Sequence, residues 1–258
     1  MNSDARLALS QEDIDFFCAN GYLPLGKMLE DEEIELLRGE YDREFELGRA
    51  GKREFRNIAI DDTDDLEKKN RAKKQMLQIM QMCERNIHFR KLLFKDTILD
   101  VVEDLIGPNI QLFHDQALYK PPRHGAQVTW HQDNGYWKCA PANLVSCWIT
   151  LDDVDKANGA MQFKPGSHLK PVSHAKVEGS ALLESDVESG GDDITVVPLP
   201  AGGAAIHHCQ TLHHTDPNTT DRQRRAFAIH YMVPGTRSLR TGEYLDVKFA
   251  RPLLRGKL

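Results

Sequence analysis

The chain has 258 residues, a net charge of -6 and a sequence pI of about 6.0. Its hydrophobic content of 40% and charged content of 28% are typical of a globular protein with a sizeable core. The acidic balance and the lack of a dense Lys/Arg block beside aromatic residues argue against a nucleic-acid surface, and no apolar run is long enough for a membrane span.

The first six residues lack the apolar run and cleavage site of a secretory signal, so we expect no export. The five cysteines are odd in number and contain no CxxC pair, which argues against both a disulfide framework and a zinc knuckle. They are Cys18, Cys83, Cys139, Cys147 and Cys209. This cysteine usage predicts a cytoplasmic protein.

The N-terminal part is predicted to be mostly helical. Ser10 has the properties of an N-cap and Gly21 marks the end of a short helix, after which residues 22–25 can form a brief strand. A second helix is expected from Asp31, because apolar residues recur at intervals of three and four: Ile34, Leu37, Tyr41 and Phe45. Two further helices are predicted within residues 86–106, and Gly107-Pro108 ends the second.

Residues 49–75 are rich in charge and poor in apolar positions, and they include Asp61-Asp62-Thr63-Asp64-Asp65. A solvated loop is favoured for this stretch over a binding role. A substrate cover is the alternative, since segments that close over active sites are often of this type.

From residue 110 the pattern changes to a period of two, which predicts a strand over residues 110–118. Further short strands are expected at 126–133, 144–151, 160–163, 194–197, 204–209 and 224–233, and residues 170–193 are expected to form a long loop. This pattern favours a mainly β sandwich or barrel behind a helical block. We expect a single domain over residues 1–258, with a helical part (1–109), a core (110–235) and a C-terminal tail (236–258).

The motif that carries most chemical information is His131-Gln132-Asp133. In an extended segment over 126–133 the side chains alternate, so His131 and Asp133 point the same way and Gln132 points opposite. An imidazole and a carboxylate, with one more His from elsewhere, make a facial triad that leaves open positions on Fe(II). If the motif stood alone, a surface His beside a solvated Asp would be favoured.

Several other motifs follow in a fixed order: Asn158-Gly159-Ala160-Met161, Pro165-Gly166-Ser167-His168, His213-His214-Thr215-Asp216-Pro217-Asn218 and Arg224-Arg225-Ala226. Together with the His-x-Asp motif, this series resembles the phytanoyl-CoA dioxygenase family over about residues 11–235. The resemblance implies an oxygenase that depends on Fe(II) and 2-oxoglutarate. It also implies a double-stranded β-helix (jelly-roll, cupin-like) core with N-terminal helices packed on it.

Four histidines crowd the segment that would supply the third metal ligand, and periodicity alone does not choose among them. The resemblance selects His213, which precedes the hydroxyl residue Thr215 and a Pro-Asn turn. His214 stands where the family usually has Gly, and we expect it to lie behind the ligands. The resemblance gives His208 a structural or supporting role, and His207 is expected to be an ordinary core or surface His.

The strand over 224–233 places Arg224 on a face with small residues, Ala226 and Ala228, and Arg225 on the opposite face. Its small side predicts a cavity wall with Arg224 at the mouth, where a guanidinium can bind a carboxylate with two parallel hydrogen bonds. Judged by charge alone, a surface salt bridge is the favoured role for Arg224. We expect Arg225 to face water.

Further contacts are implied by the resemblance only. It assigns Arg224 to the distal carboxylate of 2-oxoglutarate and places Trp148 beside this cosubstrate. Gln116 falls at a contact position, and Thr215 can offer its hydroxyl. Before the resemblance is considered, Trp148 is equally well explained as a buried aromatic residue.

The resulting expectation is an iron enzyme that uses O2 to decarboxylate 2-oxoglutarate to succinate and CO2 and to hydroxylate an unactivated C-H bond of a small-molecule metabolite. Asp133 favours hydroxylation, because related halogenases have Gly or Ala there; desaturation and ring closure stay open. Two alternatives are a catalytically inactive cupin-like metal-binding or sensor protein and a zinc hydrolase, for which we find no general base.

The substrate is not specified by the sequence. Tyr136, Trp137 and the loops 121–128 and 170–193 are expected to shape its pocket. An amino acid, an alkaloid-like metabolite, a small phosphonate and a CoA thioester are all compatible with it, and the oligomeric state is unknown.

Overall fold

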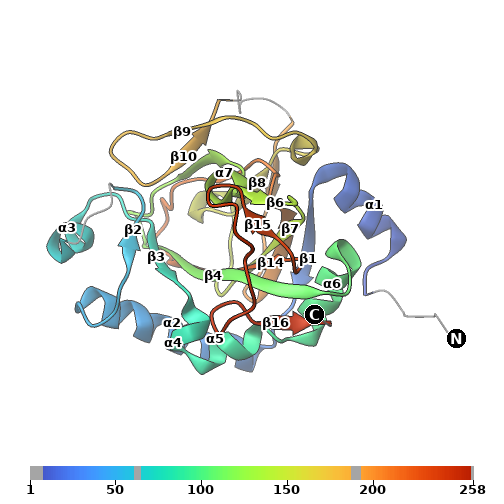
Figure 1. Cartoon of the computed structure of the whole chain (residues 1–258). Helices are drawn as coiled ribbons and strands as arrows, with labels where there is room; N and C mark the ends of the chain where they lie inside the picture. Colours follow the sequence, from blue (N-terminus) through green and yellow to red (C-terminus); the bar gives the residue numbers. More distant parts are fainter. Residues whose placement is uncertain (1–7, 61–64, 187–192, 257–258) are drawn as a thin grey trace, which may run out of the picture.

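The computed structural model describes residues 8–60, 65–186 and 193–256. Its N-terminal part is largely helical, as predicted, and Figure 1 shows these helices on the outside of the molecule. They are α1 (Gln11–Asn20), α2 (Asp31–Arg49), α3 (Leu66–Arg71), α4 (Met82–Arg85), α5 (Ile87–Leu92) and α6 (Asp96–Ile106).

The predicted helix boundaries are confirmed where capping chemistry defines them. The Ser10 side chain accepts a hydrogen bond from the Asp13 amide and the Asp13 carboxylate accepts one from the Ser10 amide, so both amides are satisfied at the start of α1. Gly21 ends α1 with a φ of 79°, a left-handed conformation that glycine adopts without a steric cost. Gly107, with a φ of 94°, likewise ends α6.

The strands form two main antiparallel sheets. The large sheet has the order β1-β12-β7-β14-β4-β3-β2, and β16 pairs with β4. Its strands are β1 (Tyr22–Lys27), β2 (Arg56–Asn57), β3 (Leu77–Met80), β4 (Ile110–Lys120), β7 (Leu144–Thr150), β12 (Gly203–His208), β14 (Arg224–Met232) and β16 (Leu253–Arg255).

The smaller sheet has the order β11-β8-β13-β5. Its strands are β5 (Val128–His131), β8 (Met161–Phe163), β11 (Thr195–Val197) and β13 (His213–Thr215). Two short ribbons complete the set: β9 (His174–Lys176) with β10 (Leu183–Ser185), and β6 (Cys139–Ala140) with β15 (Arg237–Ser238). A short helix, α7 (Asp133–Trp137), follows β5 directly.

The two faces of the large sheet have different neighbours. Its outer face carries bulky residues such as Phe227 and Tyr231, which belong to one buried cluster with Tyr41 of α2 and Phe89 of α5. In Figure 1 the helices α2, α4 and α5 lie below the sheet, and the β9-β10 ribbon lies on the opposite side of the molecule. The inner face carries small residues and packs against the smaller sheet, so the two sheets enclose the space in which the site lies.

Three segments differ from the predictions. Residues 49–75 are more ordered than a solvated loop, since they contain β2 and α3 and bury Phe55 and Ile58. The predicted long loop over 170–193 contains the β9-β10 ribbon. The predicted C-terminal tail contributes β15 and β16. Parts of these predictions fall on residues 61–64 and 187–192, which lie outside the described residues. The first six residues, on which the prediction about a secretory signal rests, also lie outside them.

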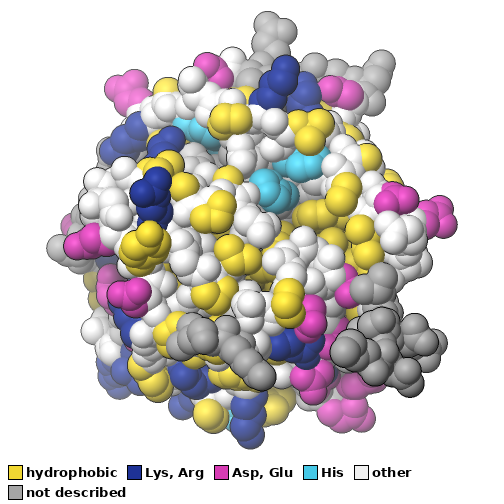
Figure 2. All heavy atoms as spheres, turned by 45° about the vertical axis from the view of Figure 1, so that its right-hand side comes forward, with side chains coloured by type: hydrophobic (Ala, Val, Ile, Leu, Met, Phe, Trp, Pro, Cys, Tyr) yellow, Lys and Arg dark blue, Asp and Glu magenta, His cyan; other side chains and the backbone are white. Residues whose placement is uncertain are grey.

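The surface bears on the predicted partners. On the face shown in Figure 2, Lys and Arg side chains and Asp and Glu side chains lie mostly around the rim, and hydrophobic and His side chains occupy much of the middle. This face is therefore unlike the continuous basic surface that nucleic acids require. Within the described residues, no helix has both the length and the apolar character needed to cross a membrane.

Candidate metal centre and adjoining cavity

Pairing of β13 with β5 brings two of the predicted ligands together. His213 lies opposite His131 in the ladder, and their ring centroids are 4.1 Å apart. The Asp133 Oδ1 atom lies 3.8 Å from His131 Nε2 and 3.7 Å from His213 Nε2. One ligand atom from each of the three residues lies within 4.8 Å of the others, so a single ion can contact all three. All three residues are buried.

The predicted strand over 126–133 is too long, because β5 ends at His131 and Asp133 is the first residue of α7. His131 and Asp133 still point to the same side, as predicted, because of the backbone conformation of the residue between them. Gln132 keeps an extended backbone, with φ -102° and ψ 135°, so the alternation continues through it. The Gln132 side-chain amide points away from the two ligands and donates from Nε2 to the carbonyl oxygens of Lys170 and Gln210.

Backbone carbonyls fix the protonation of both imidazoles. His131 donates from Nδ1 to Thr129 O at 2.7 Å, and His213 donates from Nδ1 to Thr211 O at 2.9 Å. Each ring therefore leaves the lone pair of Nε2 for a metal. Burial lowers the pKa of both rings, that of His213 well below its ordinary value, so both are neutral near pH 7.

The Asp133 carboxylate uses its two oxygens differently. Oδ2 accepts hydrogen bonds from Ser146 Oγ at 2.8 Å and from His207 Nε2 at 3.1 Å, whereas Oδ1 faces the two imidazoles. Burial alone would raise the pKa of Asp133, but His213 and His207 outweigh that effect and the pKa lies well below its ordinary value. The group is therefore a carboxylate, as a metal ligand must be.

Ser146 and His207 were missed in the sequence, although a signal for His207 exists. On β12 the bulky Ile206 belongs to the helix-side cluster, so His207 must lie on the other face with Ala205. His208 lies on the opposite face of β12 from His207, and its Nδ1 accepts a hydrogen bond from the Gln210 backbone amide. The contact with Asp133 on this strand is made by His207.

The His214 side chain is not directed toward the three ligand residues His131, Asp133 and His213. Its Nε2 lies 3.0 Å from Asp216 Oδ1 and its ring stacks on Trp130 at a centroid distance of 5.2 Å. This placement agrees with the choice of His213 as the member of the pair that is directed to the metal position.

A cavity of about 340 Å³ adjoins the triad and extends to Arg224. Every predicted cosubstrate contact lines it, as do both aromatic residues expected in the substrate pocket. These residues are Gln116, Trp148, Thr215, Arg224, Tyr136 and Trp137. Arg56 and Ile58 from the charged stretch, and Ala181 and Leu182 from the β9-β10 turn, also line the cavity. Both segments predicted as loops thus border the cavity.

Arg224 is 1% exposed and has fewer partners than a buried guanidinium requires. It donates to Leu118 O at 3.0 Å and contacts Met76 Sδ at 3.8 Å, and neither partner carries a charge. Among the described residues its Nε has no hydrogen-bond partner, and its guanidinium carbon lies 5.7 Å from the centre of the Trp148 ring. Burial lowers the pKa of Arg224 to about 10, so it remains a cation at neutral pH. An anion from outside the chain would satisfy this group.

A second buried basic residue adjoins Arg224. Lys120 pairs with Arg224 across the ladder, and its Nζ donates to Thr215 Oγ1 at 2.7 Å and to Asp216 O at 2.5 Å. Burial and the nearby Arg224 hold the pKa of Lys120 well below its ordinary value. Burial and Arg224 together therefore disfavour a second positive charge at this position.

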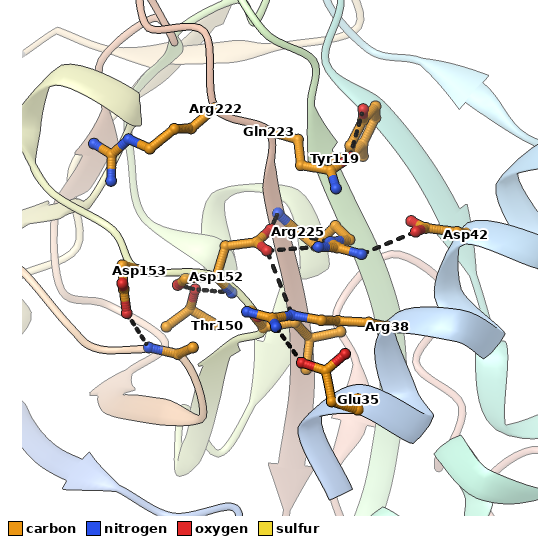
Figure 3. A network of polar contacts seen from close by, with 12 residues as sticks. Glu35, Arg38, Asp42, Tyr119, Thr150, Asp152, Asp153, Arg222, Gln223 and Arg225 are labelled. Atoms are coloured by element: carbon orange, nitrogen blue, oxygen red, sulfur yellow. Dashed lines mark hydrogen bonds and ion pairs between the residues drawn. The ribbon is translucent and has the colours of Figure 1, made fainter. Parts of the chain in front are cut away.

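The prediction that Arg225 faces water is wrong, since the residue is 7% exposed. Figure 3 shows its guanidinium between Asp152 and Asp42. It donates from Nη2 to Asp152 Oδ1 at 2.7 Å and from Nη1 to Asp42 Oδ2 at 2.9 Å. Asp42 lies on α2, so Arg225 fastens that helix to β14 on the side of the sheet away from the cavity.

Comparison with known proteins supports the interpretation of this site as the metal centre of an oxygenase. The family model "Phytanoyl-CoA dioxygenase (PhyH)" matches residues 17–226. The chain is 29% identical over 222 residues to a Stutzerimonas stutzeri protein named "Probable alpha-ketoglutarate-dependent hypophosphite dioxygenase", covering 82% of this chain and 74% of that protein. It is 28% identical over 236 residues to the peroxisomal phytanoyl-CoA dioxygenase of Mus musculus, covering 86% and 68%.

A solved structure shows the same fold. The epimerase SnoN, in complex with Fe3+, alpha ketoglutarate and nogalamycin RO, superposes with a TM-score of 0.75 at 21% identity, and the match covers 95% of this chain and 98% of that chain. The family model matches most of the chain, and the His-Asp-His group is intact. The chain therefore belongs to the phytanoyl-CoA dioxygenase family of oxygenases, which use iron and 2-oxoglutarate.

Proposed function

We propose that this protein hydroxylates an unactivated C-H bond of a small-molecule metabolite and converts 2-oxoglutarate and O2 to succinate and CO2. His131, Asp133 and His213 hold Fe(II), and iron with 2-oxoglutarate supplies the oxidising chemistry. The protein holds the cosubstrate and the target carbon in place and limits the access of water.

The observation that carries this proposal is the burial of Arg224 in the wall of the cavity that the triad also lines, with no negatively charged hydrogen-bond partner among the described residues. Leaving a guanidinium without an anionic partner inside a protein is costly. A dicarboxylate that reaches from the metal to Arg224 provides that partner. The free Nε and the Nη groups offer the two parallel donors that a carboxylate accepts.

Thr215 is the second group assigned to the distal carboxylate. Because Lys120 donates to Thr215 Oγ1, the hydroxyl must direct its own hydrogen elsewhere. The cavity is the side on which the proposed carboxylate lies. Trp148 covers this end of the cosubstrate, and Gln116 contacts it from β4 with the amide hydrogen that its other hydrogen bonds leave free.

A compact substrate, or a small end of a larger one, fits the remaining space. About 340 Å³ is at the lower end of the range for ligand sites, and part of it is taken by the cosubstrate. The wall beyond the metal is mostly apolar, formed by residues such as Ile58, Met80, Trp137 and Leu182. We therefore assign to the pocket a target group that is small and largely apolar.

Hydroxylation is assigned over halogenation because Asp133 is present as a ligand and occupies the position that a halide would take.

We assign the fold of the core, which the large and the smaller sheet make up, to the double-stranded β-helix. We assign one oxygenase domain to residues 1–258, because the large sheet includes both β1 and β16. The five free cysteines fit a cytoplasmic location.

Anaerobic titration of the metal-free protein with Fe(II) and then 2-oxoglutarate tests the proposal. A visible metal-to-ligand charge-transfer band that needs both additions, followed by succinate release when O2 is admitted, is expected. Zn(II) in place of Fe(II) should give neither signal. A folded protein that shows no band would contradict an oxygenase, and a band without succinate from any candidate metabolite would favour the inactive metal-binding alternative.

A further inference from the structure

A chain of hydrogen bonds runs from the Asp133 carboxylate to strand β3. Ser146 Oγ lies 2.8 Å from Asp133 Oδ2 and 2.7 Å from His230 Nδ1. His230 Nε2 lies 2.8 Å from Gln116 Nε2, and Gln116 Oε1 lies 2.5 Å from Gln78 Nε2. Its members come from three neighbouring strands of the large sheet, β7, β14 and β4, and then β3.

The carboxylate sets the direction of every bond near it. An ionised Asp133 has only acceptors, so Ser146 must donate its hydroxyl hydrogen to Oδ2. The Ser146 oxygen is then the acceptor for His230, which must carry its hydrogen on Nδ1. A neutral ring with a hydrogen on Nδ1 has a lone pair on Nε2.

The same constraint passes outward along the chain. The lone pair on His230 Nε2 requires a donor, so Gln116 must turn its NH2 group toward the ring and its carbonyl oxygen toward β3. Gln78 then must present its own NH2 group to Gln116. The last atom, Gln78 Oε1, is buried and has no hydrogen-bond partner among the residues that the structure describes, so the series of hydrogen bonds ends there.

We infer that Ser146, His230, Gln116 and Gln78 are positioning residues that act through Asp133 Oδ2 and hold the carboxylate with Oδ1 directed toward the two imidazoles. This inference rests on the proposed metal centre. With Oδ2 accepting from Ser146 and His207, a second metal bond from the same carboxylate would have to displace these hydrogen bonds. One-oxygen binding keeps positions on the metal open for the cosubstrate and O2.

The chain also restricts the rotation of the carboxylate. The buried members lie in sheet strands, and Ser146 and His230 are Cα partners in the ladder between β7 and β14. A ligand held by such an outer partner is oriented before the metal binds, and losing that partner typically weakens metal binding by about 10- to 100-fold.

The test uses the full-length protein and does not depend on turnover. The His230 tautomer is read from long-range proton-nitrogen correlations of the Zn(II)-bound, nitrogen-15-labelled protein, with His230→Phe identifying the signal. A hydrogen on Nδ1 is expected. A ring that carries its hydrogen on Nε2 would reverse the chain and overturn the inference.

Metal affinity gives the second measurement, made anaerobically with Fe(II) and without cosubstrate. Ser146→Ala is expected to bind Fe(II) about 10- to 100-fold more weakly than wild type, and Gln78→Leu should show a smaller loss in the same direction. Ser185→Ala is the matched control, because Ser185 is also buried and its hydroxyl has no hydrogen-bond partner in the described part of the chain. It should bind Fe(II) as wild type does.

The outcomes separate this inference from the proposed function. If Ser146→Ala binds Fe(II) as tightly as Ser185→Ala, the positioning role is rejected even if the wild type produces succinate. If the wild type has the expected tautomer and Ser146→Ala loses affinity, but no condition yields succinate, the proposed function fails and the positioning role stands.

Discussion

Adjacent arginines on β14 allow the site and the fold to be tested separately. Arg224 faces the cavity and Arg225 faces α2, so the substitutions Arg224→Leu and Arg225→Leu remove the same charge from opposite sides of one strand. We expect Arg224→Leu to lose 2-oxoglutarate binding while the protein stays folded. Arg225→Leu should lose stability and keep its affinity as long as it is folded.

The magnitudes follow from the contacts. Removing the partner of a desolvated carboxylate costs about 2 to 5 kcal/mol, which corresponds to roughly 30- to 5,000-fold in affinity. Arg224 has no charged partner within hydrogen-bonding distance among the described residues, so replacing it by Leu removes a buried cation and should not lower the stability of the ligand-free protein. Arg225 is held by Asp152 and Asp42. Breaking such a buried pair costs about 3 to 5 kcal/mol, and Arg38, 3.6 Å from Asp152, offsets part of this.

Two assays distinguish these effects. Calorimetric titration of 2-oxoglutarate into the Mn(II)-loaded protein measures affinity, and urea unfolding without ligand measures stability. Saturating 2-oxoglutarate should stabilise wild type and Arg225→Leu by about 2.7 kcal/mol at one hundred times the dissociation constant, but the same concentration should stabilise Arg224→Leu by less than about 1 kcal/mol. Equal losses of affinity in the two folded variants would refute the assignment of the two faces.

Three other predictions concern the metal centre and pH. Asp133→Ala should abolish product formation yet retain part of its Fe(II) in the presence of 2-oxoglutarate, because two imidazoles and a chelating cosubstrate remain; iron content after anaerobic loading checks this. His213→Ala should lose iron and His214→Ala should keep it, and the opposite result would show that the wrong histidine of the pair was chosen. Burial lowers the pKa of His208 and His230 from an ordinary 6.5 to about 4, so the unfolded chain binds more protons between these values. The free energy of unfolding should therefore fall as pH drops from 6.5 toward 4, by about 1.4 kcal/mol per pH unit for each imidazole, and urea unfolding across this range would reveal a flat profile if the reasoning fails.

Helix ends and strand faces were predictable from the sequence, because capping and side-chain alternation depend on residues that are close together in the chain. Ser10 and Gly21 bound α1 because capping and left-handed backbone depend on adjacent residues. The two faces of β14 were also predictable, since alternation persists along a regular strand. Its bulky residues, such as Phe227, pack toward the helices, and Ala228 lines the cavity.

Partners that are distant in the chain were not predictable in this way. Arg225 was expected to face water because its charge gave no hint of Asp42, 183 residues earlier, or of Asp152, 73 residues earlier. The role of Ser146 depends on β7 lying beside β14, and a serine in a strand has no sequence pattern of its own. Such contacts are set by sheet order, which single-strand periodicity does not encode.

The arrangement of Arg224 and Lys120 decides between a structural and a functional role for these two buried basic residues. They are cross-strand partners, and a second positive charge beside Arg224 is unfavourable there, which together with burial holds the pKa of Lys120 well below its ordinary value. Both are fully buried, and Arg224 lines the cavity that the His-Asp-His group also lines. In a purely structural barrel, two apolar residues would be more stable here. The unfavourable pair is explained if an anion occupies the space beside it, and a dicarboxylate that also reaches the metal meets both requirements with one ligand.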